Sequence, residues 1–376
     1  MPSPIPERTT SLSKSPWLSP PDHVQRHLLE VSLFLDRDHR GRHLWRRAGS
    51  DGFHRVAQGV YAFEPRPDDP DWLRRDRAAF TQISATLVAA PPGTVIGYEH
   101  AALLHGAPVR KIPPAVRVIS PHTTSTTHRP LGRRRHTRTL RPDHVVRLDG
   151  IPVTSLVRTA VDCARSCDIV EALVIVDYLL HRSANPNVYR REEGQMRMDR
   201  ARRDMLALID AESGYRGNRQ ARSVIRAADG WAQSRLESEA RRFCLALGMP
   251  GATLQFYVPT VRGDSFTDLG FEFDVGGTVV VSHLEVDGDV KYGSIADFRS
   301  ERHREAEIRA LGHLTARVDT DLLGTWSIRD FQRRIAQLVP RSVQVTLEPD
   351  PQFMTPWERA NARVSWLDPR LPHPHR

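Results

Sequence analysis

The sequence has little cysteine, almost no lysine and no long hydrophobic run. Its three cysteines, Cys163, Cys167 and Cys244, are an odd number that argues against a disulfide framework. Cys163 and Cys167 are spaced for half a zinc site, but no second pair completes it, so we expect buried thiols. No apolar run is long enough to span a bilayer, and residues 1–16 lack the apolar core of a signal peptide. We therefore expect a cytoplasmic protein without membrane contact.

The charge balance is basic and is carried by arginine. The formal net charge is +9, which favours a polyanionic partner. Of the 54 basic residues only Lys14, Lys111 and Lys291 are lysines, so 51 are arginines. This bias fits a GC-rich coding sequence and does not by itself indicate nucleic acid. It draws attention to Lys291, because the chain rarely uses lysine where arginine would serve.

The 376 residues are enough for two or three domains, each with its own core. Proline-rich termini flank them and are expected to be disordered. The expected fold class is a multidomain α+β and α/β protein. Its predicted segments are a disordered 1–20, a winged helix-turn-helix-like 21–63, a mixed α+β middle domain 64–181, a linker with helices 182–233, an α/β domain 234–340 and a disordered tail 341–376.

The first ordered segment suggests DNA binding. Apolar residues from Val24 to Leu35 predict a helix, the basic stretch 38–47 a second helix, and 52–63 a short hairpin. This is the order of a winged helix-turn-helix, whose second helix enters the major groove. The side chains expected at the DNA are Arg40, Arg42, Arg46, Arg47, His54 and Arg55. The alternative is a helical lead-in to the next domain with a solvated arginine face.

The middle region mixes helices and strands. The pattern predicts a helix over 72–89, a helix after Tyr98 that stops at Gly106, a strand over 115–120, and a helix after a cap at Thr154 or Ser155. Residues 123–140 form a polar, basic loop. The loop can contact phosphates, or it can be a solvated hairpin loop. The sequence leaves both open.

The C-terminal domain shows a clear succession of elements. The predicted order is helix 234–248, strands 253–261, 265–273 and 278–287, helix 295–311, strand 313–319 and helix 327–339. In the second of these strands Leu269, Phe271 and Phe273 share one face, with Asp268 and Glu272 on the other. In the third strand Leu284 and Val286 share one face, and Glu285 and Asp287 lie on the other. Each strand therefore has one apolar face, as in an antiparallel pair covered on one side.

A hairpin turn fixes how these strands pair. Gly276-Gly277 suits a two-residue loop in which both residues need positive φ. A turn there pairs 275 with 278, which places Asp268 opposite Glu285 at roughly 4.5–5.5 Å between Cβ atoms. Asp287 follows on the same face, about 6.6 Å along the strand. Asp274 has the same parity but sits beside the turn, where aspartate often bonds locally, so we prefer Asp268.

Carboxylates gathered in this way point to a metal. They repel one another unless protons or a cation are present. A Mg²⁺ ion bound by Asp268, Glu285 and Asp287 would remove that repulsion. Lys291 could return to the same pocket to stabilise a phosphate or activate water. The alternative is an exposed polar face at a sheet edge, where charges discourage aggregation.

Glu237 has two interpretations. Ser234-Arg-Leu-Glu237 fits a helix capping box, in which serine and glutamate satisfy free backbone amides. In the second interpretation the glutamate points from its helix into the metal pocket. The sequence does not choose between them.

Several blocks together resemble known families. SRLESEAR (234–241), Gln255, FTDLGF (266–271), LEVDGDVKY (284–292) and the helix with Arg304-Glu305 resemble a C-terminal domain similar to very-short-patch-repair endonucleases, of the PD-(D/E)xK restriction-endonuclease-like fold. This resemblance implies Asp268 and Glu285 as metal-binding acids and Glu237 as the core-helix acid. RRAGSDGFHRVAQGVYAF (46–63), EHAALLHG (99–106) and GIPVTSLVRTAVDCA (150–164) resemble AbiEi-type antitoxins of type IV toxin–antitoxin systems. That implies promoter DNA and a cognate toxin as partners.

The chain departs from the nuclease pattern at one position. The pattern has a lysine two residues after the glutamate, where this chain has Asp287, and Lys291 is the only substitute. We therefore expect a regulator-like DNA-binding protein fused to a nuclease-like domain that can hydrolyse phosphodiesters with Mg²⁺, through Glu237, Asp268, Glu285 and Lys291. The alternative is a non-catalytic, antitoxin-like repressor in which this domain serves binding or dimerisation.

Overall fold

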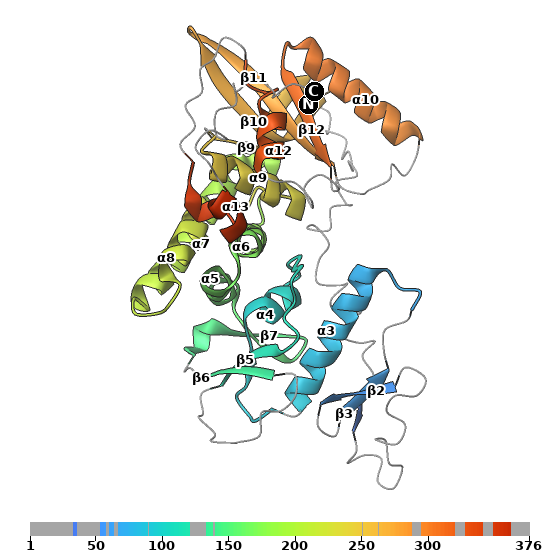
Figure 1. The fold of residues 1–376 in the computed structure, drawn as a ribbon, viewed down its shortest axis with the longest axis vertical. Helices are drawn as coiled ribbons and strands as arrows, with labels where there is room; N and C mark the ends of the chain where they lie inside the picture. Colours follow the sequence, from blue (N-terminus) through green and yellow to red (C-terminus); the bar gives the residue numbers. More distant parts are fainter. Residues whose placement is uncertain are drawn as a thin grey trace, which may run out of the picture. The chain divides into compact units, whose positions relative to one another are not determined.

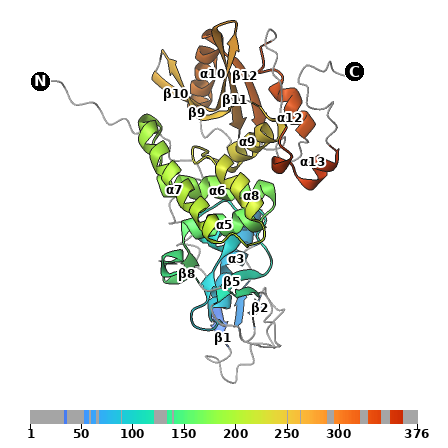
Figure 2. The same cartoon turned by 90° about the vertical axis from the view of Figure 1, so that its left-hand side faces the viewer.

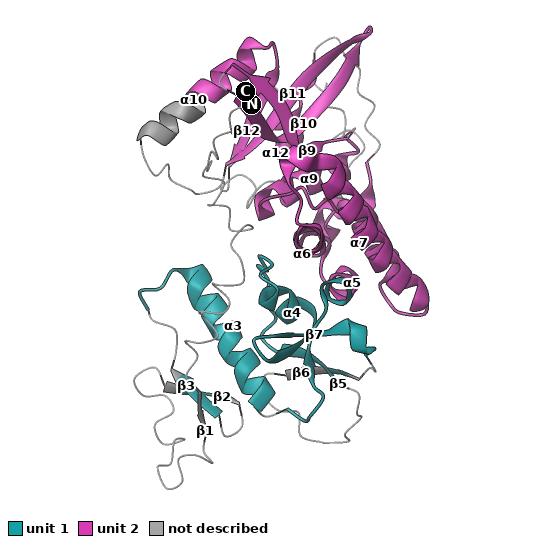
Figure 3. Ribbon diagram, turned by 180° about the vertical axis from the view of Figure 1, so that it is seen from behind, with its two compact units in different colours: residues 1–159 teal, residues 160–376 magenta. Residues whose placement is uncertain are grey.

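The protein is a mixed α+β chain, seen here in a computed structural model (Figure 1). The structure describes residues 33–35, 53–57, 60–63, 67–88, 90–120, 133–137, 140–249, 251–261, 263–287, 295–319, 328–340 and 349–361. Its contacts divide the chain into two compact units, residues 1–159 and 160–376 (Figure 3). Disorder is expected from the sequence over 1–20 and over the tail 341–376; residues 1–20, 341–348 and 362–376 lie outside the described residues.

The first unit begins with a small antiparallel sheet of order β1-β3-β2. Its strands are β1 (Leu33–Leu35), β2 (Phe53–Ala57) and β3 (Val60–Phe63). The hairpin predicted over 52–63 is confirmed, with Phe53 opposite Phe63. The helix predicted to reach Leu35 is wrong at its end, because Leu33–Leu35 pair with β3 and satisfy their backbone groups there. The basic helix predicted over 38–47 lies outside the described residues.

A second sheet of the first unit has the order β6-β5-β4-β8-β7. Its elements, with the helices between them, are α3 (Asp71–Val88), β4 (Val95–Ile96), α4 (Tyr98–Leu104), β5 (Val116–Ser120), β6 (Arg133–Thr137), η2 (Pro142–His144), β7 (Val145–Leu148) and β8 (Ile151–Thr154). Both helices and the strand near 115–120 agree with the prediction. The prediction of a loop over 123–140 is wrong for Arg133–Thr137, which form β6, parallel to β5.

Helices form the lower part of the second unit in Figure 2. They are α6 (Ile169–Ala184), α7 (Arg191–Ala211) and α8 (Asn218–Ala227), with η3 (Val188–Arg190) before α7; α5 (Leu156–Ser166) spans the division between the units. Helix α6 is buried along most of its length. The cysteines are free and buried as predicted, and burial raises the pKa of the Cys244 thiol to about 12.

The sheet of the second unit and the helices around it follow the predicted order of elements. It comprises α9 (Arg235–Leu247), β9 (Thr253–Thr260), β10 (Gly263–Val275), β11 (Thr278–Asp287), α10 (Ile295–Ala310), β12 (Leu314–Asp319) and α12 (Ile328–Ile335). The sheet order is β12-β11-β10-β9, with β12 parallel to β11 and the other pairs antiparallel. Figure 2 shows α9 between this sheet and the helices α6 to α8.

The C-terminal tail contains a structured segment that the sequence did not predict. Residues 349–361 include η4 (Pro351–Phe353) and α13 (Pro356–Asn361). Phe353 and Glu358 are buried, and Glu358 pairs with Arg242 of α9 at 2.8 Å. The tail is ordered here because it covers α9 and neutralises a buried arginine on that helix.

Candidate functional site

The candidate site lies where β10 and β11 part. Their pairing runs from Val275–Thr278 to Leu269–Leu284, the register predicted from the glycine pair. Both turn glycines have positive φ, +59° at Gly276 and +87° at Gly277, as a two-residue hairpin loop requires. One step beyond the last of these pairs, the same register places Asp268 opposite Glu285.

Beyond the last backbone pair of β10 and β11, the Asp268 side chain bonds to the backbone of β11. Its Oδ2 atom accepts a hydrogen bond from the backbone N–H of Val286 at 2.6 Å. Burial raises the pKa of the Asp268 carboxyl well above its ordinary value, and the nearby charges of Glu285 and Glu237 raise it further. The carboxyl groups of these three residues are therefore close enough to oppose one another's ionisation.

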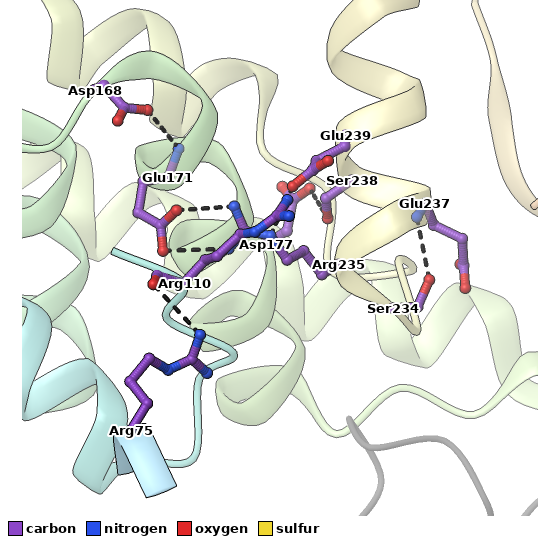
Figure 4. Close-up of polar contacts among 10 residues, drawn as sticks. All are labelled: Arg75, Arg110, Asp168, Glu171, Asp177, Ser234, Arg235, Glu237, Ser238 and Glu239. Carbon is purple, nitrogen blue, oxygen red and sulfur yellow. Dashed lines mark hydrogen bonds and ion pairs between the residues drawn. The ribbon is translucent and has the colours of Figure 1, made fainter. Parts of the chain in front are cut away.

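Glu237 serves as a helix cap and as a member of this acidic cluster. Its backbone N–H donates to the Ser234 hydroxyl at 3.1 Å, as Figure 4 shows, and its carboxylate accepts from the backbone N–H of Gln233 at 2.9 Å. Both bonds belong to a capping arrangement. The side chain is also buried, and burial together with the charge of Glu285 raises the pKa of Glu237 to about 7. The capping interpretation is confirmed. The side chain also lies near Glu285, and a role for it beside a metal ion stays a prediction.

Gln255 links Glu237 to the sheet. Its Nε2 atom donates to Glu237 Oε2 at 3.2 Å. Along β9 and β10 the pairs Leu254–Leu269 and Phe256–Thr267 flank Gln255 and Asp268. Gln255 has a φ of +49°, a left-handed conformation that is uncommon within a strand for a residue other than glycine. Such local strain concentrates at functional sites.

Glu285 already has a cationic neighbour. Arg304 of α10 lies 3.3 Å from Glu285 Oε1 and also donates to the backbone carbonyl of Phe266 at 3.2 Å. The guanidinium therefore stands at the edge of the acidic cluster and partly offsets its charge. The positive charge of Arg304 acts to lower the pKa of Asp268, but burial and the two glutamates outweigh it.

Asp287 and Asp274 have their own partners outside this cluster. Asp287 pairs with Arg317 of β12 at 3.0 Å, so the structure does not bring its carboxylate into the cluster with Asp268. Asp274 accepts a hydrogen bond from Gly277 N–H at 2.7 Å and is a turn residue, in line with the preference for Asp268. Lys291 lies outside the described residues.

The cluster offers only oxygen donors, which suit Mg²⁺. Within the described parts of the chain, no three or more His, Cys, Asp or Glu side chains are arranged to hold a metal ion together. Mg²⁺ is usually held by one or two carboxylates and keeps several waters, so two acids can suffice. Asp268 and Glu285 would hold it, provided that the Arg304 guanidinium moves from Glu285.

The predicted DNA-contacting residues are only partly described. Arg40, Arg42, Arg46 and Arg47 lie outside the described residues. His54 and Arg55 lie on β2 in the N-terminal hairpin, where the Arg55 side chain is exposed.

A buried ionic network fixes α9 against α6 (Figure 4). Asp177 of α6 is fully buried, and it accepts hydrogen bonds from Arg241 at 2.8 Å, from the Ser238 hydroxyl at 2.7 Å and from Asp229 N–H at 2.8 Å. Nearer the start of α9, Arg235 pairs with Glu171 at 2.8 Å. These contacts hold the helix that carries Glu237 in place.

Sequence reasoning missed this network, although one signal for it was present. Asp177 interrupts the apolar run Val174-Ile-Val-Asp-Tyr-Leu-Leu180, and an acid within such a run must have a buried partner. Its partner, Arg241, lies 64 residues further along the chain, and nothing local indicates which arginine it is.

Comparison with protein-family models, with curated proteins and with solved structures gives no match. A separate observation concerns the membrane: no helix in the described parts of the chain is long and apolar enough to cross one.

Proposed function

We propose that the protein is a DNA-binding, regulator-like protein whose C-terminal domain hydrolyses phosphodiesters with Mg²⁺. The observation that carries the proposal is the convergence of Glu237, Asp268 and Glu285 from α9, β10 and β11, where the pKa values of Glu237 and Asp268 are raised. Acids that are held close together and whose like charges repel one another are characteristic of sites that bind a cation. The resemblance of this domain to PD-(D/E)xK endonucleases assigns the same three residues.

In this proposal each acid has its own task. Asp268 and Glu285 hold the ion, which supplies a Lewis acid and an activated water when bound. Glu237 has a pKa of about 7, in the range that suits a general base at neutral pH. In this proposal Glu237 accepts a proton from water. Lys291 assists by stabilising charge on the phosphate.

DNA recognition is assigned to the N-terminal segment. The β2–β3 hairpin follows a basic stretch containing Arg40, Arg42, Arg46 and Arg47, and a net charge of +9 favours a polyanion. The resemblance to AbiEi-type antitoxins adds promoter DNA and a cognate toxin to the proposal. We also propose a cytoplasmic location.

The test is a cleavage assay with the full chain, several DNA forms and Mg²⁺ or Mn²⁺. We expect wild-type protein to cleave at least one form, and Glu285→Gln to reduce the rate by about 100-fold or more, as losing an essential charge-stabilising group does. Glu272→Gln is the control, because Glu272 is exposed on the same strand as Asp268. Cleavage that survives Glu285→Gln would remove the assignment of the site.

Two observations favour the non-catalytic alternative. Arg304 occupies the side of Glu285 that a metal ion would need, and Asp287 stands where the nuclease pattern has lysine. In that case the domain serves DNA binding or dimerisation in an antitoxin-like repressor. Sequence-specific DNA binding that is indifferent to a chelator and to Glu285→Gln, with no cleavage of any DNA form, would support it.

A further inference from the structure

A pocket opens beside the acidic cluster. It has a volume of about 220 Å³ and lies between β11, α10, β12 and α12. Glu285 forms part of its wall, so the pocket and the acidic cluster share one side chain. The other charged residues of the wall are Arg304, Glu305, Arg309, Arg317 and Arg334.

The charge of this pocket is positive. Four arginines and two glutamates line the wall, an excess of two positive charges, and Asp287 just outside the wall balances one of them. Arg309 pairs with Glu305 at 2.7 Å, and Arg317 pairs with Asp287, which is outside the wall. Arg334 lies on the last turn of α12, and its guanidinium has neither an ion-pair nor a hydrogen-bond partner among the residues that the structure describes.

The volume of the pocket suits a small anion. Pockets for drug-sized ligands usually measure about 300–1,000 Å³, and this one is smaller. Guanidinium groups present paired N–H donors that match the oxygens of a tetrahedral phosphate. A phosphate group would accept hydrogen bonds from Arg334 and would balance the positive charge that the acidic side chains do not neutralise.

We propose that this pocket binds a phosphate group and that Arg334 is its principal new contact. The pocket adjoins Glu285, so a bound phosphate would lie next to the acids. That the phosphate belongs to DNA rests on the proposed function, whereas binding of phosphate itself does not. The group could be a backbone phosphodiester or a terminal phosphomonoester, since both present the same oxygens.

The first experiment measures inorganic phosphate binding to the full chain by calorimetry in the presence of a chelator. We expect Arg334→Gln to weaken binding by about tenfold, the loss of one charge-assisted hydrogen bond. Arg333→Gln is the matched control, because Arg333 is the neighbouring residue, is exposed and pairs with Asp330 at 3.4 Å. Equal affinities for wild type and Arg334→Gln, with equal thermal stability, would overturn the proposal.

The second experiment identifies the source of the phosphate. Oligonucleotides with and without a 5′-phosphate are compared for binding to wild type, Arg334→Gln and Glu285→Gln. A preference for the 5′-phosphate that Arg334→Gln abolishes assigns a terminal group, and an equal loss for both oligonucleotides assigns a backbone phosphate. If Arg334→Gln changes neither, the pocket assignment fails. If Arg334→Gln weakens binding but no DNA is cleaved, the pocket stands and the hydrolytic function fails.

Discussion

Glu237 combines two roles that usually fall to different residues. As a cap it satisfies a backbone amide at the start of α9, and as a buried acid its carboxyl has a pKa of about 7. Capping favours the ionised form, whereas burial beside Glu285 favours the protonated one. Burial dominates, so the protonation of this residue changes near neutral pH.

This raised pKa predicts a pH-dependent stability. The folded state holds a proton on Glu237 up to about pH 7, whereas the unfolded chain releases it near pH 4.5. The folded state therefore binds more protons between these values, and stability falls as pH rises through this window, by roughly 3 kcal/mol at most. Asp268, whose pKa is also raised, acts in the same direction. Urea unfolding from pH 4.5 to pH 8 measures the effect.

Glu237→Gln provides the comparison, because an amide keeps the shape and does not titrate. We expect this variant to lose part of the decline in stability between pH 4.5 and pH 7, and Glu272→Gln to keep it. A wild-type slope unchanged in Glu237→Gln would mean that this carboxyl is not the titrating group. Added Mg²⁺ should stabilise wild type more at pH 8 than at pH 6, because a metal ion needs the deprotonated acids.

At the residue scale the sequence predicted the pairing of acids well and their partners poorly. Alternation and the glycine pair determine which residues face each other, and both can be read locally for Asp268 and Glu285. The ion pairs of Glu285 with Arg304 and Asp287 with Arg317 join separate elements. In a chain with 51 arginines, no local pattern shows which arginine reaches which acid.

At the scale of elements, β10 depends on a glycine at one position. A Cβ atom at Gly270 would lie 2.2 Å from the Phe256 ring on β9. The ring occupies the space that a side chain at position 270 would need. We expect Gly270→Ala to destabilise the protein by about 1–3 kcal/mol, as overpacking does, measured by chemical denaturation.

Two further variants test the reason for this loss. Gly251→Ala is the control, because a Cβ atom there meets nothing within 4 Å. Phe256→Leu should recover part of the loss when combined with Gly270→Ala. If Gly270→Ala is as stable as wild type, the close contact between ring and strand does not exist in solution.

The order of elements from α9 to α12 could be predicted because each element carries its own periodicity and turn residues. Where the prediction failed, distant pairing decided the structure. Leu33–Leu35 form a strand because they pair with β3. Arg133–Thr137 form a strand because they pair with β5. The segment 349–361 is ordered against Arg242, which lies more than a hundred residues earlier.

At the scale of the whole molecule, the proposal assigns DNA recognition to the first unit and hydrolysis to the second. Deleting residues 1–63 should abolish sequence-specific DNA binding, because it removes the hairpin and the basic stretch before it. Wild-type affinity should fall steeply as salt rises, since arginine–phosphate contacts release counterions. Electrophoretic mobility shift at several salt concentrations measures both effects. Specific binding that survives the deletion would place recognition elsewhere.

The Asp177 network bears on how the second unit can be divided. Arg241 is buried in α9, and its counter-ion comes from α6. A fragment starting at Ser234 would leave that guanidinium without a carboxylate, at a cost of about 3–5 kcal/mol. We expect such a fragment to be insoluble or unfolded by circular dichroism, and one that begins before α6, at residue 160, to fold. A stable fragment 234–340 would contradict this.

The same buried pair limits how this part of the chain could be exchanged by recombination. The sheet and α9, which together carry the three acids, cannot be moved onto another protein by themselves, because Asp177 of α6, some sixty positions upstream, must accompany Arg241. The smallest segment that could be exchanged therefore contains both the helices from α6 onward and the sheet. It begins several helices before Glu237.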